Sequence, residues 1–129
     1  GGDTEEVLSF FAEDCLYEDF NYEAPLRGKP EVQDFLEKFQ EIKSLRFVPE
    51  RFSDGETACC FTWHVEIAGL PTDGPQVRGI SFYRLDAEGK IAFVRDIPES
   101  ATKPPPLQAL AATVRPKLRM FLPQEGTLP

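Results

Sequence analysis

The chain has 129 residues, of which 41% are hydrophobic and 28% charged, and its formal net charge is -8. This length fits one domain with a sizeable core and is too short for two ordinary domains. The acidic balance disfavours binding to nucleic acid or anionic lipid, and no apolar run approaches the ~20 residues that span a bilayer.

The N-terminal segment begins with a helix signal. Asp3 and Glu6 have the spacing of a capping box, which marks helix starts. The apolar residues that follow predict a short helix ending near Asp14. Residues 15–20 have a β-like sequence and predict a strand, and a loop then extends to Gly28.

A longer apolar stripe predicts the second helix. Pro30 suits the first turn of a helix, where its missing N–H costs no hydrogen bond. Apolar residues then recur at spacings of three and four, namely at Val32, Phe35, Leu36, Phe39 and Ile42. The pattern predicts an amphipathic helix over residues 30–42.

The next part of the chain predicts an antiparallel sheet. Turn-forming residues separate four β-like segments, which we predict as strands over residues 45–52, 57–68, 76–85 and 90–97. Pro49 places the first of them at a sheet edge or at a bulge. Two helices and a strand followed by four strands predict an α+β domain.

The C-terminal part has a different character. Residues 98–106 are rich in proline and predict an extended linker. An apolar stripe predicts a terminal helix over residues 107–122, and Pro116 should kink it. We therefore expect a single domain over residues 1–122 and a flexible tail over residues 123–129.

Cysteine spacing and short motifs exclude several kinds of chemistry. The three cysteines, Cys15, Cys59 and Cys60, do not form a CxxC motif or a metal-ligand spacing with histidine, so we expect no metal. Free thiols favour a reducing intracellular compartment. The sequence also lacks a P-loop, a GxGxxG and an HExxH motif, and we expect no cofactor.

Several segments resemble the NTF2-like superfamily, which includes the SnoaL-like proteins: FFAEDCLYED, APLRGKPEVQDFLEKF, TWHVEIAG, GISFYRLDAEGKI and VRDIPES. The resemblance extends from about Asp3 to Phe121. It is most specific to an uncharacterised group from plants and algae, often with plastid targeting, and so implies a chloroplast location.

The resemblance implies a cone, in which a strongly curved antiparallel sheet has helices on its concave face. It also implies a long first helix at the mouth of the cone. The sequence starts after the place where that helix ends in the family, so we expect this helix to be missing from the 129 residues.

The segment FTWHVEI predicts a strand whose two faces differ, because side chains alternate along a strand. Phe61 and Trp63 lie on the face expected to point into the cone, as core residues or as walls of a ligand pocket. His64 and Glu66 lie on the opposite, outer face. They are either an acid–base pair or, by our preferred interpretation, a polar pair at a protein interface.

The following strands also carry large apolar side chains on their outer face. Ile80 and Phe82 alternate with Arg78 and Arg84, and Phe93 belongs to the same outer face. An exposed apolar patch of this kind commonly marks a protein contact. Many NTF2-like proteins pair through this face, so the resemblance implies a homodimer or contact with another protein subunit.

Asp96 is the candidate catalytic residue. It shares a predicted strand face with Val94, which we expect to line the cavity, and desolvation there would raise the pKa of its carboxyl toward neutrality. Asp19 is the second polar candidate, with Tyr17, Tyr22 or Tyr83 as a hydrogen-bond donor, and Tyr17 is expected to line the pocket. In the alternative, Asp19 is solvated, and Asp96 either forms an ion pair with Arg78, Arg84 or Arg95 or caps the loop into Pro98.

Two functional hypotheses follow from these patterns. The first is a non-catalytic binding or assembly module that pairs through its outer sheet face, with no nucleic acid or membrane as partner. The second is a SnoaL-like isomerase, cyclase or hydrolase that acts on an apolar, carbonyl-containing small molecule, with Asp96 as its acid–base.

Overall fold

The computed structural model describes residues 2–20, 22–73 and 77–100, and the predicted terminal helix over residues 107–122 and the tail lie outside these ranges. The elements in chain order are α1 (Gly2–Ser9), β1 (Phe11–Asp19), β2 (Leu26–Arg27), α2 (Gly28–Gln40), β3 (Leu45–Asp54), β4 (Ala58–Ile67), β5 (Val77–Leu85) and β6 (Ile91–Pro98).

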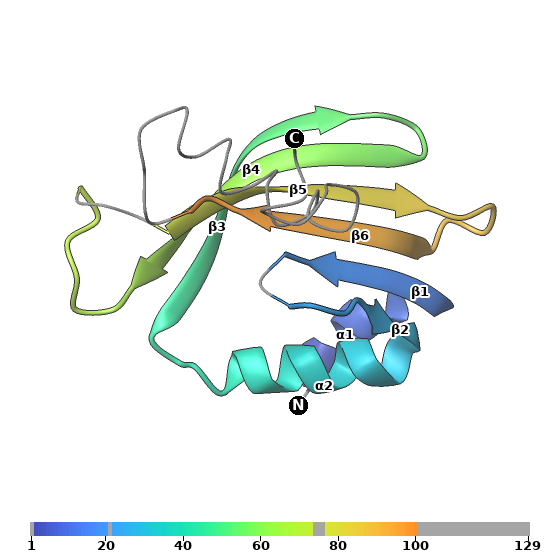
Figure 1. Ribbon diagram of the computed structural model, residues 1–129, viewed down its shortest axis with the longest axis horizontal. Helices are drawn as coiled ribbons and strands as arrows, with labels where there is room; N and C mark the ends of the chain where they lie inside the picture. Colours follow the sequence, from blue (N-terminus) through green and yellow to red (C-terminus); the bar gives the residue numbers. More distant parts are fainter. Residues whose placement is uncertain (1, 21, 74–76, 101–129) are drawn as a thin grey trace, which may run out of the picture. The chain divides into compact units, whose positions relative to one another are not determined.

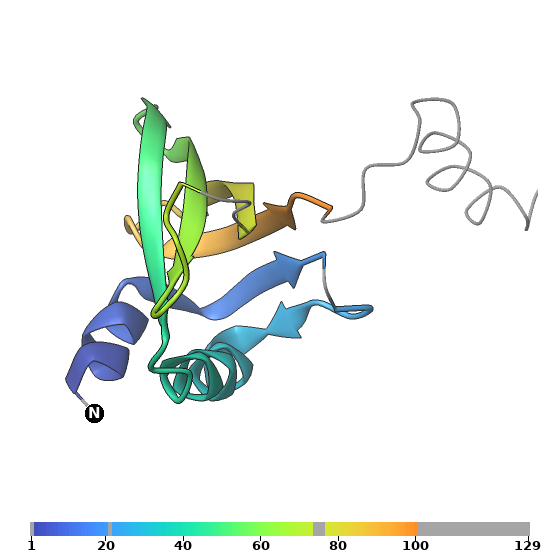
Figure 2. The same cartoon turned by 90° about the vertical axis from the view of Figure 1, so that its left-hand side faces the viewer.

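The strands form one six-stranded sheet in the order β2-β1-β6-β5-β4-β3. All neighbouring strands are antiparallel except β1 and β6, which run parallel. Figures 1 and 2 show that the sheet is strongly curved and not closed, with α1 and α2 side by side next to β1. This arrangement confirms the predicted α+β cone.

The core lies where α1 and α2 pack on β1 and β6. Val32 of α2 and Val94 of β6 are fully buried, and Cys15 and Tyr17 of β1 are nearly so. Burying an aliphatic side chain of this size stabilises a fold by about 1.5–3 kcal/mol. The apolar stripe of α2 therefore holds this helix against the sheet.

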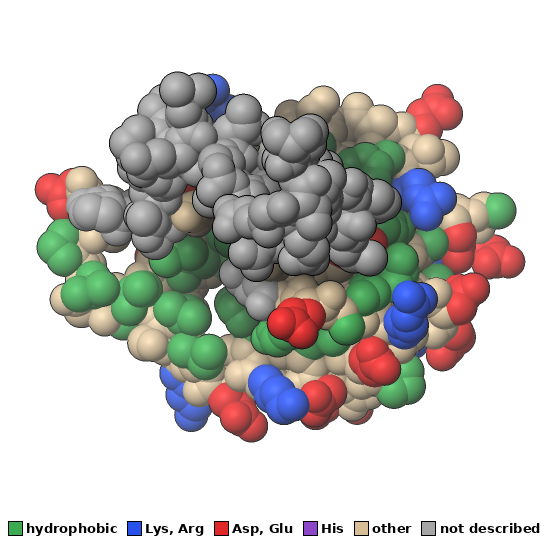
Figure 3. All heavy atoms as spheres, in the orientation of Figure 1, with side chains coloured by type: hydrophobic (Ala, Val, Ile, Leu, Met, Phe, Trp, Pro, Cys, Tyr) green, Lys and Arg blue, Asp and Glu red, His purple; other side chains and the backbone are tan. Residues whose placement is uncertain are grey.

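The polar side of α2 faces solvent. Lys38 forms an ion pair with Asp34 one turn earlier, at 2.7 Å, and Gln33 donates a hydrogen bond to Glu37. Along the lower edge of Figure 3, where α2 lies, basic and acidic side chains accordingly alternate. The helix is therefore amphipathic, as its sequence predicts.

The predicted end of the first helix is wrong. α1 ends at Ser9 rather than near Asp14, and β1 already begins at Phe11. The backbone N–H of Ile91 donates to the carbonyl of Phe10 at 2.7 Å, and Phe11 pairs with Ile91 across the sheet. Pairing with β6, distant in sequence, therefore overrides the local helical pattern.

The sheet edge at β3 agrees with the prediction from Pro49. β3 is the last strand in the sheet order, and its register with β4 shifts between Pro49 and Phe52. At the opposite edge, the two-residue strand β2 was not predicted. It leads directly into α2, where Gly28 has a φ of 79° and a Cβ would lie 3.2 Å from the carbonyl oxygen of Glu13. Glycine is thus favoured there on both grounds.

Candidate functional site

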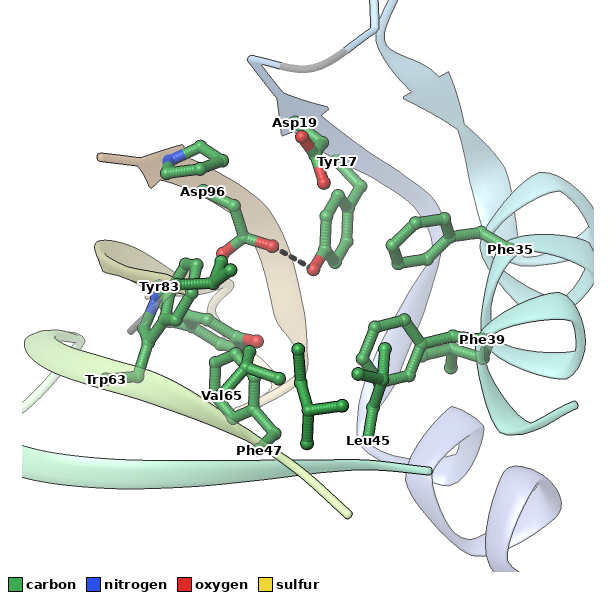
Figure 4. A pocket seen from close by; sticks show the side chains of 14 residues that line it. Tyr17, Asp19, Phe35, Phe39, Leu45, Phe47, Trp63, Val65, Tyr83 and Asp96 are labelled. Atoms are coloured by element: carbon green, nitrogen blue, oxygen red, sulfur yellow. Dashed lines mark hydrogen bonds between the residues drawn. The ribbon is translucent and has the colours of Figure 1, made fainter. Parts of the chain in front are cut away.

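A cavity of about 350 Å³ lies between α2 and the concave face of the sheet. Figure 4 shows its wall, to which six elements contribute fourteen side chains. The lining residues are Tyr17, Asp19, Phe35, Leu36, Phe39, Leu45, Phe47, Trp63, Val65, Ile67, Val77, Tyr83, Asp96 and Pro98. Most are apolar or aromatic. Two are acidic, Asp19 and Asp96, and none is basic.

Asp96 is the centre of the polar part of this wall. Its Oδ2 accepts a hydrogen bond from the Tyr17 hydroxyl, drawn in Figure 4, and its Oδ1 accepts one from the Ser81 hydroxyl. The strand register brings these side chains together, because Asp96 is aligned with Ser81 of β5 on one side and with Asp19 of β1 on the other. All four side chains consequently share the concave face.

The surroundings of Asp96 change its proton affinity. Burial raises the pKa of the Asp96 carboxyl and the charge of Asp19 adds to the rise, while the hydrogen bonds from Ser81 and Tyr17 oppose it. Burial also raises the pKa of the Tyr17 and Tyr83 hydroxyls, which therefore stay protonated at neutral pH. Asp96 is thus a weaker acid than an exposed aspartate.

The alternative in which Asp96 pairs with an arginine is wrong. Arg78 pairs with Glu99 and Arg95 with Glu18, each at 2.7 Å, and the Arg84 guanidinium lies over the ring of Phe93. These arginines alternate with the cavity residues along β5 and β6 and so belong to the outer face.

Trp63 forms the wall on the β4 side. Its Nε1 donates a hydrogen bond to Ser81 Oγ at 2.8 Å, and its ring packs against Phe47 with centroids 4.7 Å apart. A Cβ on Gly79, which is aligned with Trp63, would lie 2.5 Å from Cζ2 of the indole. The indole therefore occupies space that only a glycine leaves open.

Not all residues predicted for the pocket line it. Trp63 and Tyr17 do, but Phe61 and Val94 are not among the lining side chains. The Phe61 ring packs between Phe52 and Tyr83, and Val94 is fully buried in the helix-packed core. Alternation along a strand predicts the face of a residue, but not whether another side chain covers it.

The sequence reasoning missed Ser81, which bonds to Asp96 without lining the cavity, and several residues that do line it. Ser81 follows Gly79 and precedes Tyr83 at alternating positions of one strand face, which is a signal that places it beside the cavity. Phe35 and Phe39 were predicted only as a stripe that anchors α2, yet the same stripe extends over the cavity. Phe47 had no distinguishing signal, because its role depends on the pairing of β3 with Trp63 on β4.

His64 and Glu66 lie on the outer face, as alternation predicts. The His64 Nδ1 lies 2.7 Å from Glu50 Oε1, and its Nε2 lies 3.4 Å from Glu66 Oε1. Glu66 also accepts two hydrogen bonds from Arg46. The hydrogen bond to Glu50 is the main cause that raises the pKa of His64, and the bond to Glu66 adds to it. The group forms a polar cluster outside the cavity.

Apolar side chains gather elsewhere on that outer face. Ile80, Phe82 and Ile97 are 39%, 38% and 44% exposed, and Phe93 is half-buried. The rings of Phe82 and Phe93 lie together with centroids 6.1 Å apart. We refer to these four residues as the outer patch.

The residues that the structure describes contain no group of three His, Cys, Asp or Glu side chains arranged to hold a metal ion. Within the same ranges, no helix has the length and apolar character needed to cross a membrane.

Comparison with known proteins agrees with this fold. The family model for the SnoaL-like domain matches residues 1–94, and the chain therefore belongs to the SnoaL-like domain family. No curated protein matches the sequence.

Solved structures with the same fold have low sequence identity to this chain. A steroid delta-isomerase from Pseudomonas aeruginosa superposes with a TM-score of 0.61 at 16% identity, covering 92% of this chain and 81% of its own. A protein of Kribbella flavida DSM 17836, provisionally assigned as a ketosteroid isomerase, gives 0.64 at 18% identity, covering 100% and 80%. A computationally designed 17-OHP binder gives 0.60 at 19% identity, covering 74% and 78%.

Proposed function

We propose that the domain is an acid–base enzyme that moves a proton within an apolar, carbonyl-containing small molecule, with Asp96 as the proton carrier. The observation that carries this proposal is the place of Asp96 on the wall of an apolar cavity, with its pKa raised by burial. A carboxyl group in such surroundings suits proton transfer near neutral pH.

The reaction class that fits these groups is isomerisation through an enolate. The Asp96 carboxylate takes a proton from the carbon next to the substrate carbonyl, and the electron pair of that C–H bond moves toward the carbonyl oxygen. The Tyr83 hydroxyl, which lines the cavity and stays protonated, donates a hydrogen bond to this oxygen. Asp96, now neutral, returns the proton to a second carbon, and the carbonyl re-forms.

The cavity wall indicates what the substrate looks like. Aromatic rings from α2 and β3 line the wall away from Asp96, including Phe39 and Phe47, whereas Trp63 lies beside the polar part of the wall (Figure 4). A body of fused apolar rings with one carbonyl group suits this division. Two proteins of similar fold are described as a steroid delta-isomerase and a 17-OHP binder, which supports the same substrate class for this chain.

The test is turnover of a β,γ-unsaturated ketone of two or more fused rings, followed by the ultraviolet absorbance of the conjugated product. Asp96→Asn should lower kcat by about 10²–10⁴-fold, because the amide cannot carry the proton. Glu88→Gln, which removes an acidic side chain from an exposed turn, is the matched control and should leave kcat unchanged. Equal turnover by the wild type and Asp96→Asn would exclude this role.

A second function, pairing of two copies through the outer face, is favoured by the outer patch. Covering each large apolar side chain should contribute about 1.5–3 kcal/mol before the cost of association. Phe82→Asp should halve the mass measured by sedimentation, whereas Leu70→Asp, at a 60% exposed position in the β4–β5 loop, should not. A monomeric wild type would end this proposal and leave the first intact. A plastid location remains a prediction from the resemblance alone.

A further inference from the structure

A chain of hydrogen bonds extends from the cavity wall to Asp96. Trp63 Nε1 donates to Ser81 Oγ at 2.8 Å, and the Ser81 hydroxyl bonds to Asp96 Oδ1. The indole N–H has no acceptor function, so Ser81 Oγ must accept from it. The only hydrogen of the Ser81 hydroxyl is then directed to Asp96.

Burial restricts the hydrogen bonds that the Ser81 hydroxyl can form. Ser81 is 1% exposed and Trp63 is 5% exposed. Every buried side-chain nitrogen or oxygen in the described residues has a hydrogen-bond partner. A buried hydroxyl that turned away from Asp96 would lose a charge-assisted hydrogen bond, which is among the stronger contacts in a protein interior.

The position of the indole is itself fixed from three sides. Phe47 packs against the ring, Gly79 leaves the space for its edge, and Ser81 accepts its N–H. The same ring forms part of the cavity wall. The group that orients Ser81 is therefore in contact with the space where a ligand would bind.

We infer that Trp63 and Ser81 are positioning residues: the indole N–H orients the Ser81 hydroxyl as a donor that holds Asp96 in its ionised form. The inference rests on the proposed function for its catalytic meaning, because it assigns the control of the proton carrier at that site. Tyr17 supplies the second donor to Asp96. Asp19 and Tyr83 are the other titratable groups that influence it.

The experiment is a ¹³C NMR titration of the Asp96 carboxyl carbon, assigned with the Asp96→Asn variant. Ser81→Ala should strengthen proton binding at Asp96 by about tenfold, because one donor to the carboxylate is lost. Ser81→Cys, whose S–H is a weak donor, should give an intermediate value. In the active protein, the acidic limb of the pH–rate profile should move toward higher pH in the same order.

The contribution of the indole needs a change that removes only its N–H. Replacing Trp63 with β-(3-benzothienyl)alanine keeps the shape of the ring and exchanges the N–H for sulfur. This replacement should strengthen proton binding at Asp96, as Ser81→Ala does, by a smaller amount. Phe52→Leu is the control and should leave the Asp96 titration unchanged, because Phe52 lies on the same strand as Phe47 but packs against Phe61 and does not line the cavity.

Two results would overturn the inference: an Asp96 titration that is the same in the wild type and Ser81→Ala, or a benzothienyl variant that titrates like the wild type. Neither result depends on a substrate. If Asp96→Asn retained full turnover while the titrations moved as expected, the proposed function would fail and the positioning role would stand.

Discussion

Gly79→Ala adds a single methyl group at the point where Trp63 crosses β5. The new Cβ would lie 2.5 Å from Trp63 Cζ2, 2.8 Å from Cη2 and 2.5 Å from the carbonyl oxygen of Ile97. A contact below 3.0 Å with a backbone atom requires a shift of the strands, because no side-chain rotation relieves it. The indole must also move, which disturbs its hydrogen bond to Ser81.

Opposing effects decide the size of the change. Alanine stabilises by about 0.4–1 kcal/mol through the unfolded chain, because it has fewer unfolded conformations than glycine. Overpacking costs about 1–3 kcal/mol or more, and loss of the buried hydrogen bond from Trp63 to Ser81 costs about 1 kcal/mol. We therefore expect Gly79→Ala to lower the free energy of unfolding by about 2–3 kcal/mol.

The assay is urea unfolding followed by circular dichroism, together with intrinsic fluorescence. Trp63 is the only tryptophan in the chain, so its emission reports directly on this contact. Gly69→Ala is the control: its Cβ would meet nothing within 4 Å, although its φ of +87° costs alanine about 1 kcal/mol. A Gly79→Ala protein as stable as the wild type, with the same emission, would refute the assigned position of the indole.

Two further changes test the core and the outer face. Val32→Ala should lower the free energy of unfolding by about 2 kcal/mol, because Val32 is fully buried. The control Val7→Ala, at a 40% exposed site, should change it by less than about 0.5 kcal/mol. Equal urea midpoints for the two variants would contradict the packing of α2. The raised pKa of His64 means that its charged form stabilises the fold below the unfolded pKa of about 6.5, and that this contribution is lost as the pH rises through the folded value. The Tm of the wild type should therefore fall relative to that of His64→Gln between about pH 6 and pH 8. Parallel profiles of Tm against pH would show that the contacts of His64 with Glu50 and Glu66 do not form in solution.

Local patterns were sufficient for much of the fold. The stripe around Val32 is a property of one helix, and the bulge at Pro49 follows from its missing N–H. Alternation along β6 correctly placed Asp96 on the cavity side, because the side-chain period of a strand depends only on sequence position. These features need no knowledge of distant residues.

The remaining features depend on contacts between distant parts of the chain. Tyr17 and Asp96 are 79 positions apart, and their hydrogen bond requires the parallel pairing of β1 with β6. The same pairing shortens α1 and starts β1 at Phe11. The role of Ser81 likewise depends on two neighbouring strands, which supply Trp63 on one side and Asp96 on the other.

Proton exchange at carbon tests the role of Asp96 most directly, because it requires no knowledge of the product: Asp96 takes a proton from carbon, the proton on its carboxyl group exchanges with D₂O, and a deuteron is returned to the same carbon. A saturated ketone of two fused rings, such as 2-decalone, is incubated with the protein in D₂O, and deuterium at the carbons next to the carbonyl is followed by NMR. The wild type should accelerate this exchange, and Asp96→Asn should do so at least about 100-fold less. Exchange at the uncatalysed rate with the wild type, or equal acceleration by both proteins, would contradict the role of Asp96.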